Sequence, residues 1–147
     1  MTPAFDPVAF VDRYLTRNEK GEPWRLAPHQ RRVLARMFRR PFPLRCWSEP
    51  KKSGKTFLAA CLGLAWAFTH ARTEVIVAAN DLEQSTSRVF RTMTALLEAN
   101  PELAGSATVR AQEIRLSNGT TIVAIASEFR GAAGARHSLV IFDELWL

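Results

Sequence analysis

The chain has little cysteine, and its two cysteines show none of the spacings that bind metal ions. Cys46 and Cys61 are the only cysteines in its 147 residues. Neither belongs to a CxxC pair or to a Cys/His pair of metal-ligand spacing, and both lie in apolar stretches. These features disfavour a zinc site and a disulfide framework, and they favour a reducing compartment.

The sequence also lacks a long hydrophobic run. No apolar stretch reaches the roughly 18 residues that cross a bilayer. Residues 1–10 contain Asp6 and do not have the basic-then-apolar order of a secretory signal. We therefore expect a soluble, cytoplasmic protein without a membrane partner. Its length and its 47% hydrophobic content are typical of one globular domain with a core.

Positive charge is concentrated in the first third of the chain. Residues 1–55 carry 13 Lys or Arg against 5 Asp or Glu, whereas residues 56–147 carry 7 against 9. Two interpretations stay open: a solvated basic helix, or a surface that meets a polyanion, either a nucleotide or DNA. The arginines that contribute most are Arg31, Arg32, Arg36, Arg39 and Arg40.

The hydrophobic pattern predicts an α/β fold with a mostly parallel sheet flanked by helices. Asn118-Gly119 lies between two alternating runs and predicts a hairpin. Asp81 is expected to cap a helix. Helices are expected at residues 6–16, 28–40, 55–70 and 81–98. Strands are expected at residues 42–48, 73–79, 108–116, 120–126 and 138–142.

The segment EPKKSGKT, residues 49–56, matches the phosphate-loop pattern GxxxxGK[ST] except that Glu49 replaces the first glycine. Gly54 allows the backbone to approach phosphate closely. Lys55 is expected to reach the β- and γ-phosphates of ATP, and the Thr56 hydroxyl to bind Mg²⁺. The alternative, an ordinary basic turn, is disfavoured by the position between an expected strand and an apolar helix. The remaining candidates for nucleotide contact in the loop are Lys51, Lys52 and Ser53; the two lysines could equally be solvated.

An acidic pair follows the last expected strand. Asp143 and Glu144 end the run LVIFDE, at the carboxyl end of the strand, where open α/β sheets bind ligands. Asp143 is predicted to hold Mg²⁺ and Glu144 to act as the general base toward the attacking water. A polar loop after a strand would give the same pattern, but an upstream GKT makes that interpretation much weaker.

Three further residues are candidates for contacts with the nucleotide. Gln30 could read adenine by donating and accepting hydrogen bonds, or could be a surface glutamine. Arg130 and Arg136 lie in a glycine- and alanine-rich stretch before the acidic pair. Either arginine could neutralise transition-state charge, or both could belong to a mobile basic loop.

Together these residues resemble the ATPase domain of the large terminase subunit of tailed bacteriophages. The match rests on LAPHQRRVLARMF, on the glycine-poor loop SEPKKSGKT and on ASEFRGAAGARHSLVIFDEL. It covers about residues 26–145. The resemblance implies a P-loop NTPase core that binds ATP and Mg²⁺, with Gln30 reading adenine and Glu144 as the catalytic base. Lys51 falls near a basic loop residue of the family, and the match of its finger arginine to Arg130 or Arg136 is looser.

The resemblance also implies a packaging motor. Such subunits pump double-stranded DNA into a procapsid as a homo-oligomeric ring, with a portal protein and a small terminase subunit as partners. We expect an N-terminal helix and linker over residues 1–25 and a partial ATPase domain over residues 26–147. The core would be incomplete at its C-terminus, and the family's nuclease domain would be absent. Two other interpretations are a helicase-like ATPase, which Trp146 weakly disfavours, and a nucleotide-binding remnant without turnover.

Overall fold

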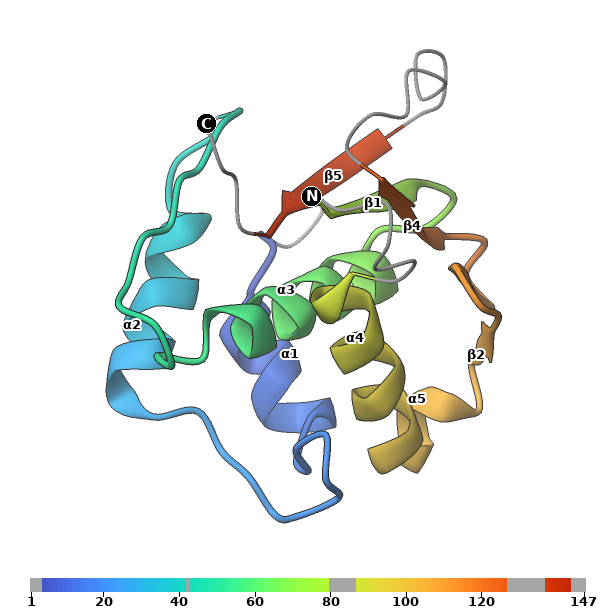
Figure 1. The fold of residues 1–147 in the computed structure, drawn as a ribbon, viewed down its shortest axis with the longest axis horizontal. Helices are drawn as coiled ribbons and strands as arrows, with labels where there is room; N and C mark the ends of the chain where they lie inside the picture. The colour runs from blue at the N-terminus through green and yellow to red at the C-terminus, as the bar shows by residue number, and fades with distance from the viewer. Residues whose placement is uncertain (1–3, 42, 80–86, 127–136, 144–147) are drawn as a thin grey trace.

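A five-stranded sheet with helices packed on one face makes up the part of the chain that a computed structural model describes, residues 4–41, 43–79, 87–126 and 137–143 (Figure 1). The helices are α1 (Pro7–Tyr14), α2 (Pro28–Met37), α3 (Lys55–Thr69), α4 (Arg88–Ala99) and α5 (Pro101–Ala104). The strands are β1 (Glu74–Ala79), β2 (Ala107–Val109), β3 (Glu113–Leu116), β4 (Thr121–Ala126) and β5 (His137–Phe142).

The sheet is mixed, so the prediction of a mostly parallel sheet is wrong. Its strand order is β2-β3-β4-β1-β5. β1 pairs in parallel with β4 and with β5, whereas β2, β3 and β4 form an antiparallel meander. The parallel half comes from strands joined by long connections, and the antiparallel half from tight turns that only antiparallel neighbours accept. β5 is therefore an edge strand of the described sheet.

The strand expected at residues 42–48 is not formed in the described residues. Residues 43–48 have no regular secondary structure, and Leu44 is 78% exposed. Pro41 and Pro43 supply no backbone N–H for a strand ladder, which disfavours pairing at this point. The phosphate loop thus follows an extended segment and not a buried strand.

The other described elements agree with the predicted ones within a few residues, apart from the short helix α5, which was not predicted, and two further differences. The run expected as one strand, residues 108–116, is divided into β2 and β3 by a tight turn in which Arg110 N–H donates to the Glu113 carbonyl. The predicted Asp81 cap lies outside the described residues. In its place the Ser87 hydroxyl accepts a hydrogen bond from Phe90 N–H at the start of α4. The Asn118-Gly119 turn joins β3 to β4, as predicted, with Gly119 at a φ of 85°.

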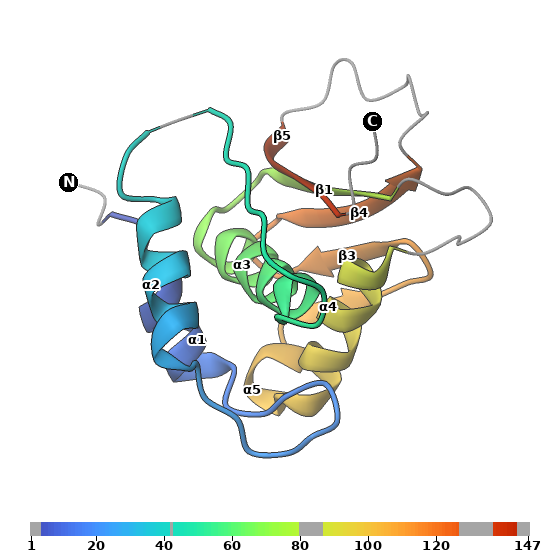
Figure 2. The ribbon, with the colours of Figure 1, turned by 60° about the vertical axis from the view of Figure 1, so that its left-hand side comes forward.

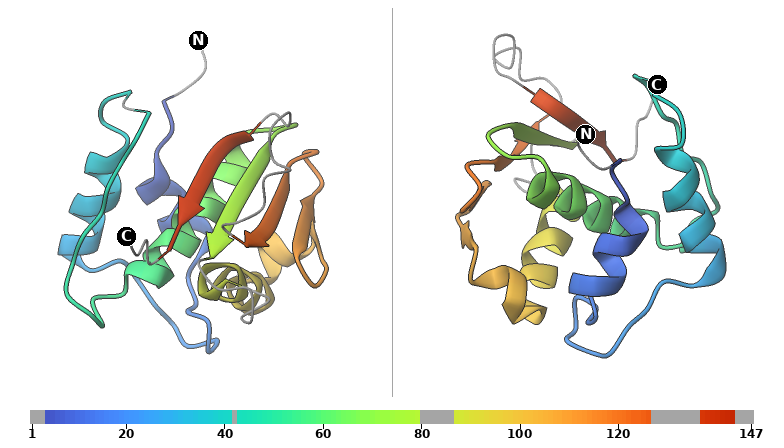
Figure 3. Two further views of the ribbon diagram at one scale, coloured as in Figure 1. Left: turned by 45° about the horizontal axis from the view of Figure 1, so that its top comes forward. Right: turned by 180° about the vertical axis from the view of Figure 1, so that it is seen from behind.

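Helix α3 is the centre of the core. Its apolar residues face all directions, and Leu58, Cys61 and Leu64 are each at most 1% exposed. It packs against α1, α2 and α4 on one side and against β1 and β5 on the other. Figures 2 and 3 show α3 between the strands and α1, with α4 beside it on the same side of the sheet, where α4 also contacts β1. A helix that is apolar all round requires this enclosure, because any face left in water would cost hydrophobic free energy.

The opposite face of the sheet is less covered at β5. Along β5, Leu139 and Ile141 pack toward the core, whereas Val140 is 41% and Phe142 56% exposed. This alternation follows from the two-residue period of a strand. Among the described residues, no helix is long and apolar enough to cross a membrane.

A polar clip holds the loop after α1 to the end of α4. The Asn100 side chain accepts from the Arg17 N–H at 3.1 Å and donates to the Arg17 carbonyl at 3.0 Å. It also donates to the Leu96 carbonyl at the last turn of α4. Asn100 is only 4% exposed, so these bonds replace the water that its amide loses on burial. The clip fixes the route by which the chain reaches α2.

The two cysteines provide a test of the packing of α3. Cys61 is fully buried, and its burial raises the pKa of the thiol, whereas Cys46 is exposed. We expect one thiol to react rapidly with a water-soluble disulfide reagent in the native protein and two to react in denaturant. Cys46→Ser should abolish the fast native reaction, and Cys61→Ala should leave it. Rapid labelling of Cys61 in the folded protein would contradict the placement of α3.

Candidate functional site

The phosphate loop ends at a glycine in the left-handed conformation. Gly54 has φ 88° and ψ 18° and precedes Lys55, the first residue of α3. A left-handed residue followed by a helical one turns successive backbone N–H groups toward one side, as in anion-binding nests. Within the described part of the chain, no side chain caps this end of α3. Its N–H groups and the positive end of its dipole are therefore available to an anion.

Lys55 is held against its own loop. Its Nζ donates to the Glu49 carbonyl at 2.6 Å and to the Pro50 carbonyl at 3.1 Å. These two bonds fold the side chain back along the loop instead of letting it extend into solvent. The ammonium is thereby placed over the loop that precedes α3, and the predicted role of Lys55 stays compatible with its position.

A hydrogen bond joins the first turn of α3 to the end of β5. Thr56 Oγ1 donates to Asp143 Oδ2 at 3.1 Å, across 87 residues of sequence. Asp143 directly follows β5, whose parallel neighbour β1 directs its carboxyl end the same way. The hydroxyl and the carboxylate, predicted separately as Mg²⁺ ligands, are thus brought into contact by the fold.

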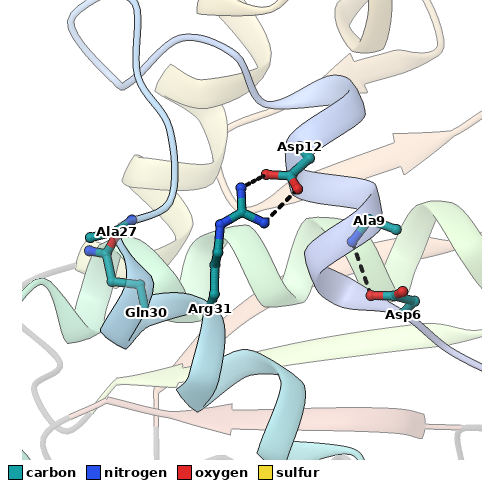
Figure 4. A network of polar contacts seen from close by, with 6 residues as sticks. All are labelled: Asp6, Ala9, Asp12, Ala27, Gln30 and Arg31. Atoms are coloured by element: carbon teal, nitrogen blue, oxygen red, sulfur yellow. Dashed lines mark hydrogen bonds and ion pairs between the residues drawn. The ribbon is translucent and has the colours of Figure 1, made fainter.

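Gln30 lies beside the phosphate loop. A Cβ built on Gly54 would be 3.7 Å from the Gln30 Nε2, so the amide nitrogen faces the loop. The Gln30 Oε1 accepts a hydrogen bond from the Ala27 N–H at 2.9 Å, which closes the first turn of α2 (Figure 4). One half of the side chain thus anchors α2 and the other half is directed at the site. Reading of adenine by Gln30 stays a prediction.

The start of α2 is also fixed to α1. The Arg31 guanidinium makes two parallel hydrogen bonds to the Asp12 carboxylate, at 2.7 and 2.6 Å (Figure 4). The paired geometry is directional, and the ion pair raises the pKa of Arg31. This contact helps to set the orientation of α2, and with it the position of Gln30.

The other loop residues differ in their surroundings. Lys51 and Lys52 are exposed, and Lys52 adopts the left-handed φ of 67°. The Ser53 hydroxyl oxygen is buried and has no hydrogen-bond partner among the described residues. Buried hydroxyls are usually paired. An unpaired one next to Gly54 is a group that a phosphate oxygen could satisfy.

A magnesium ion fits the chemistry of this site without further protein ligands. The described residues contain no cluster of three His, Cys, Asp or Glu side chains. Mg²⁺ commonly takes only one or two protein oxygens and completes its shell with water and substrate phosphates. Thr56 Oγ1 and the Asp143 carboxylate are two such oxygens.

Three of the predicted site residues fall outside the described residues. They are the predicted base Glu144 and the two candidate finger arginines, Arg130 and Arg136. Their roles stay predictions.

Two features of the site were missed by the sequence reasoning. The acceptors of Lys55 are backbone carbonyls, which no residue pattern reveals. Trp24, in the loop before α2, packs edge-on against Phe57 in the first turn of α3, with ring centres 4.7 Å apart. Trp24 also lines an open groove together with Arg17 and Arg25. The only sequence signal was an aromatic residue within a polar loop.

The chain resembles a solved structure but no family model or curated protein. Comparison with protein-family models and with curated proteins gave no match. Among solved structures, the chain is similar to the large terminase of bacteriophage HK97, with a TM-score of 0.81 and 25% sequence identity. The match covers 98% of this chain and 31% of that one, so the chain spans less than a third of the length of its relative. The predicted resemblance to a large terminase subunit is thereby confirmed.

The Thr56–Asp143 hydrogen bond can be tested without nucleotide. We expect a double-mutant cycle of Thr56→Val and Asp143→Ala, each of which removes one partner of the bond, to give a coupling of about 1 kcal/mol in the free energy of unfolding, the typical net value of a hydrogen bond. Urea denaturation without added Mg²⁺ measures it. Thr56→Ser keeps the hydroxyl and should retain most of the coupling. Strictly additive effects would mean that the two side chains do not interact in solution.

Proposed function

We propose that this chain is the nucleotide-binding part of a terminase-like ATPase, which couples ATP hydrolysis to movement of double-stranded DNA into a procapsid. The observation that carries the proposal is the contact of Thr56 with Asp143 beside a lysine at the first position of α3. An ordinary basic turn has no reason to bring a hydroxyl at the start of a helix against a carboxylate at the end of a strand. The similarity to a phage large terminase supports the choice of motor.

Each residue of the site has a distinct task in this proposal. Lys55 leaves the carbonyls of Glu49 and Pro50 and donates to the β- and γ-phosphates, so that bonds from the ammonium to anionic oxygens replace its bonds to neutral carbonyls. The backbone N–H groups at Gly54 and the start of α3 bind phosphate oxygens. Mg²⁺ held by Thr56 and Asp143 would neutralise phosphate charge during transfer to water.

The remaining roles complete the reaction. Glu144 is proposed to orient and deprotonate the attacking water. Arg130 or Arg136 is proposed to stabilise the charge that develops in the transition state, in its own subunit or a neighbour's. Gln30 selects adenine. We further propose that the working assembly is a homo-oligomeric ring that contacts a portal protein and a small terminase subunit.

Binding of ATP should depend on Lys55. Lys55→Ala removes a cation from the β- and γ-phosphates and should weaken ATP binding by about 1.5–3 kcal/mol, the range for a hydrogen bond to a charged group. Titration of ATP with Mg²⁺ present measures the affinity. Lys20→Ala, in the exposed loop after α1, removes the same charge and should leave the affinity unchanged. Unaltered affinity in Lys55→Ala would exclude the phosphate-loop assignment.

Hydrolysis should depend on Glu144. Glu144→Gln keeps the shape of the side chain and removes its basicity, so phosphate release should fall by about 10²-fold or more while ATP still binds. Glu102→Gln, on the exposed surface of α5, is the matched control. Equal turnover in Glu144→Gln and the wild type would remove Glu144 from the mechanism. ATP binding without any hydrolysis by the wild type would favour a nucleotide-binding remnant.

A further inference from the structure

A long arginine-rich segment without acidic residues leads into the phosphate loop. Residues 23–48 contain seven arginines and no Asp or Glu. A helix that only needs solubility usually mixes both signs of charge along its surface. The segment contains α2, which lies at the side of the molecule away from β2 and α5 (Figure 1).

Three of these arginines form one exposed surface, which we call the arginine face: Arg32, Arg36 and Arg39. All three side chains are exposed, whereas Leu34 is fully buried against the core. At roughly 3.6 residues per turn, the three positions lie on the side of the helix opposite Leu34. Arg39 follows the end of α2, where its N–H still donates to the Arg36 carbonyl and continues the turn.

Two neighbouring arginines have structural partners among the described residues, and the arginine face does not. Arg31 pairs with Asp12, and Arg45 donates to the carbonyls of Met37 and Arg40 while its guanidinium lies 4.4 Å from the centre of the Phe38 ring. By contrast, the side chains of the arginine face make no ion pair or hydrogen bond with any of the described residues. Two of the seven arginines thus have side-chain partners among the described residues, and of the other five, Arg32, Arg36 and Arg39 share one face of the helix.

The helix dipole does not account for this arrangement. A cation near the C-terminus of a helix is favourable, but the effect is confined to the last turn. It can explain Arg36 and Arg39. It does not explain Arg32, which lies in the first half of α2, or the lack of any acidic residue near the N-terminus of the helix.

We propose that the arginine face contacts the sugar-phosphate backbone of duplex DNA. The choice of DNA rests on the proposed function, whereas the surface itself comes from the exposure and lack of pairing of these side chains. From Arg32 to Arg39 the helix rises about 10 Å, which matches about three phosphates of one strand at roughly 3.4 Å of axial rise each. Guanidinium groups bind phosphate oxygens in pairs of parallel hydrogen bonds.

A protein partner fits this surface less well. Protein interfaces have an apolar or aromatic centre surrounded by polar residues. The other exposed residues of α2 are Pro28, His29 and Ala35, and none of them has a large apolar side chain. A row of cations without an apolar anchor is typical of contacts to the backbone of nucleic acid, which fix position and do not read sequence.

The test is the salt dependence of binding to a random-sequence DNA duplex, measured by fluorescence anisotropy. Each lost phosphate contact lowers the slope of log K against log [salt] by about 0.9. We expect Arg32→Gln, Arg36→Gln and Arg39→Gln together to lower the slope by about 2–3 and the affinity at low salt by on the order of tenfold or more. The corresponding triple Lys variant keeps the charge and should retain most of the slope.

A matched variant separates this surface from net charge. Lys20→Gln, Arg91→Gln and Arg110→Gln together remove the same charge from exposed sites outside the arginine face, and they should change the slope by less than about one unit. Equal losses in the two Gln triples, or no loss in the arginine-face triple, would overturn the proposal. Poly-glutamate that competes as strongly as duplex DNA would also overturn it, in favour of an acidic protein partner.

ATP titration distinguishes this inference from the proposed function. The arginine-face triple should bind ATP with Mg²⁺ as the wild type does, and its thermal melt should be unchanged. Lys55→Ala should lose ATP affinity and retain the salt slope for duplex DNA. If Lys55→Ala keeps its ATP affinity while the arginine-face triple loses the slope, the nucleotide assignment fails and the DNA surface stands.

Discussion

The enclosure of α3 is the constraint on which the rest of the structure depends. Its fully buried leucines, Leu58 and Leu64, each contribute on the order of 1.5–3 kcal/mol by leaving water, and they can do so only if the sheet and three helices surround them. Close packing is helped by Gly63, whose missing side chain lets α3 approach Met93 of α4 and Ile141 of β5. One apolar helix therefore positions both β5 and the helices around it.

That enclosure also builds the candidate site. Because β5 packs on α3 and runs parallel to β1, its carboxyl end comes to the N-terminus of α3, and Asp143 meets Thr56. Because α2 packs on α1 and α3 and is held by the Arg31–Asp12 pair, Gln30 comes to Gly54. The same contacts that bury Leu34 of α2 turn the arginine face outward. The proposed nucleotide site and the proposed DNA surface therefore both depend on the packing of α2 against α1 and α3.

Particular elements explain where sequence reasoning succeeded and where it failed. The Asn118-Gly119 turn was predictable because a two-residue turn needs positive φ, and Gly119 supplies it. The strand at residues 42–48 was wrongly predicted because a short apolar run is ambiguous, and because Pro41 before the run and Pro43 within it disfavour strand pairing. The mostly parallel sheet was wrong because strand direction depends on how neighbours pair. The turn between β2 and β3 created an antiparallel pair that the pattern had merged into one strand.

The sequence by itself determined the chemical groups available and the local structures that present them. GKT at the start of an apolar helix and an acidic residue after an apolar strand are local patterns, set by backbone conformation and by the period of hydrophobic residues. Only the tertiary structure decided that Thr56 and Asp143 touch and that Lys55 is held by the carbonyls of Glu49 and Pro50. It also decided that Arg31 is paired with Asp12, whereas Arg32 pairs with none of the described residues. These contacts form only when the helices and strands pack in their final arrangement. That arrangement is set by the whole core, and no local sequence pattern determines it.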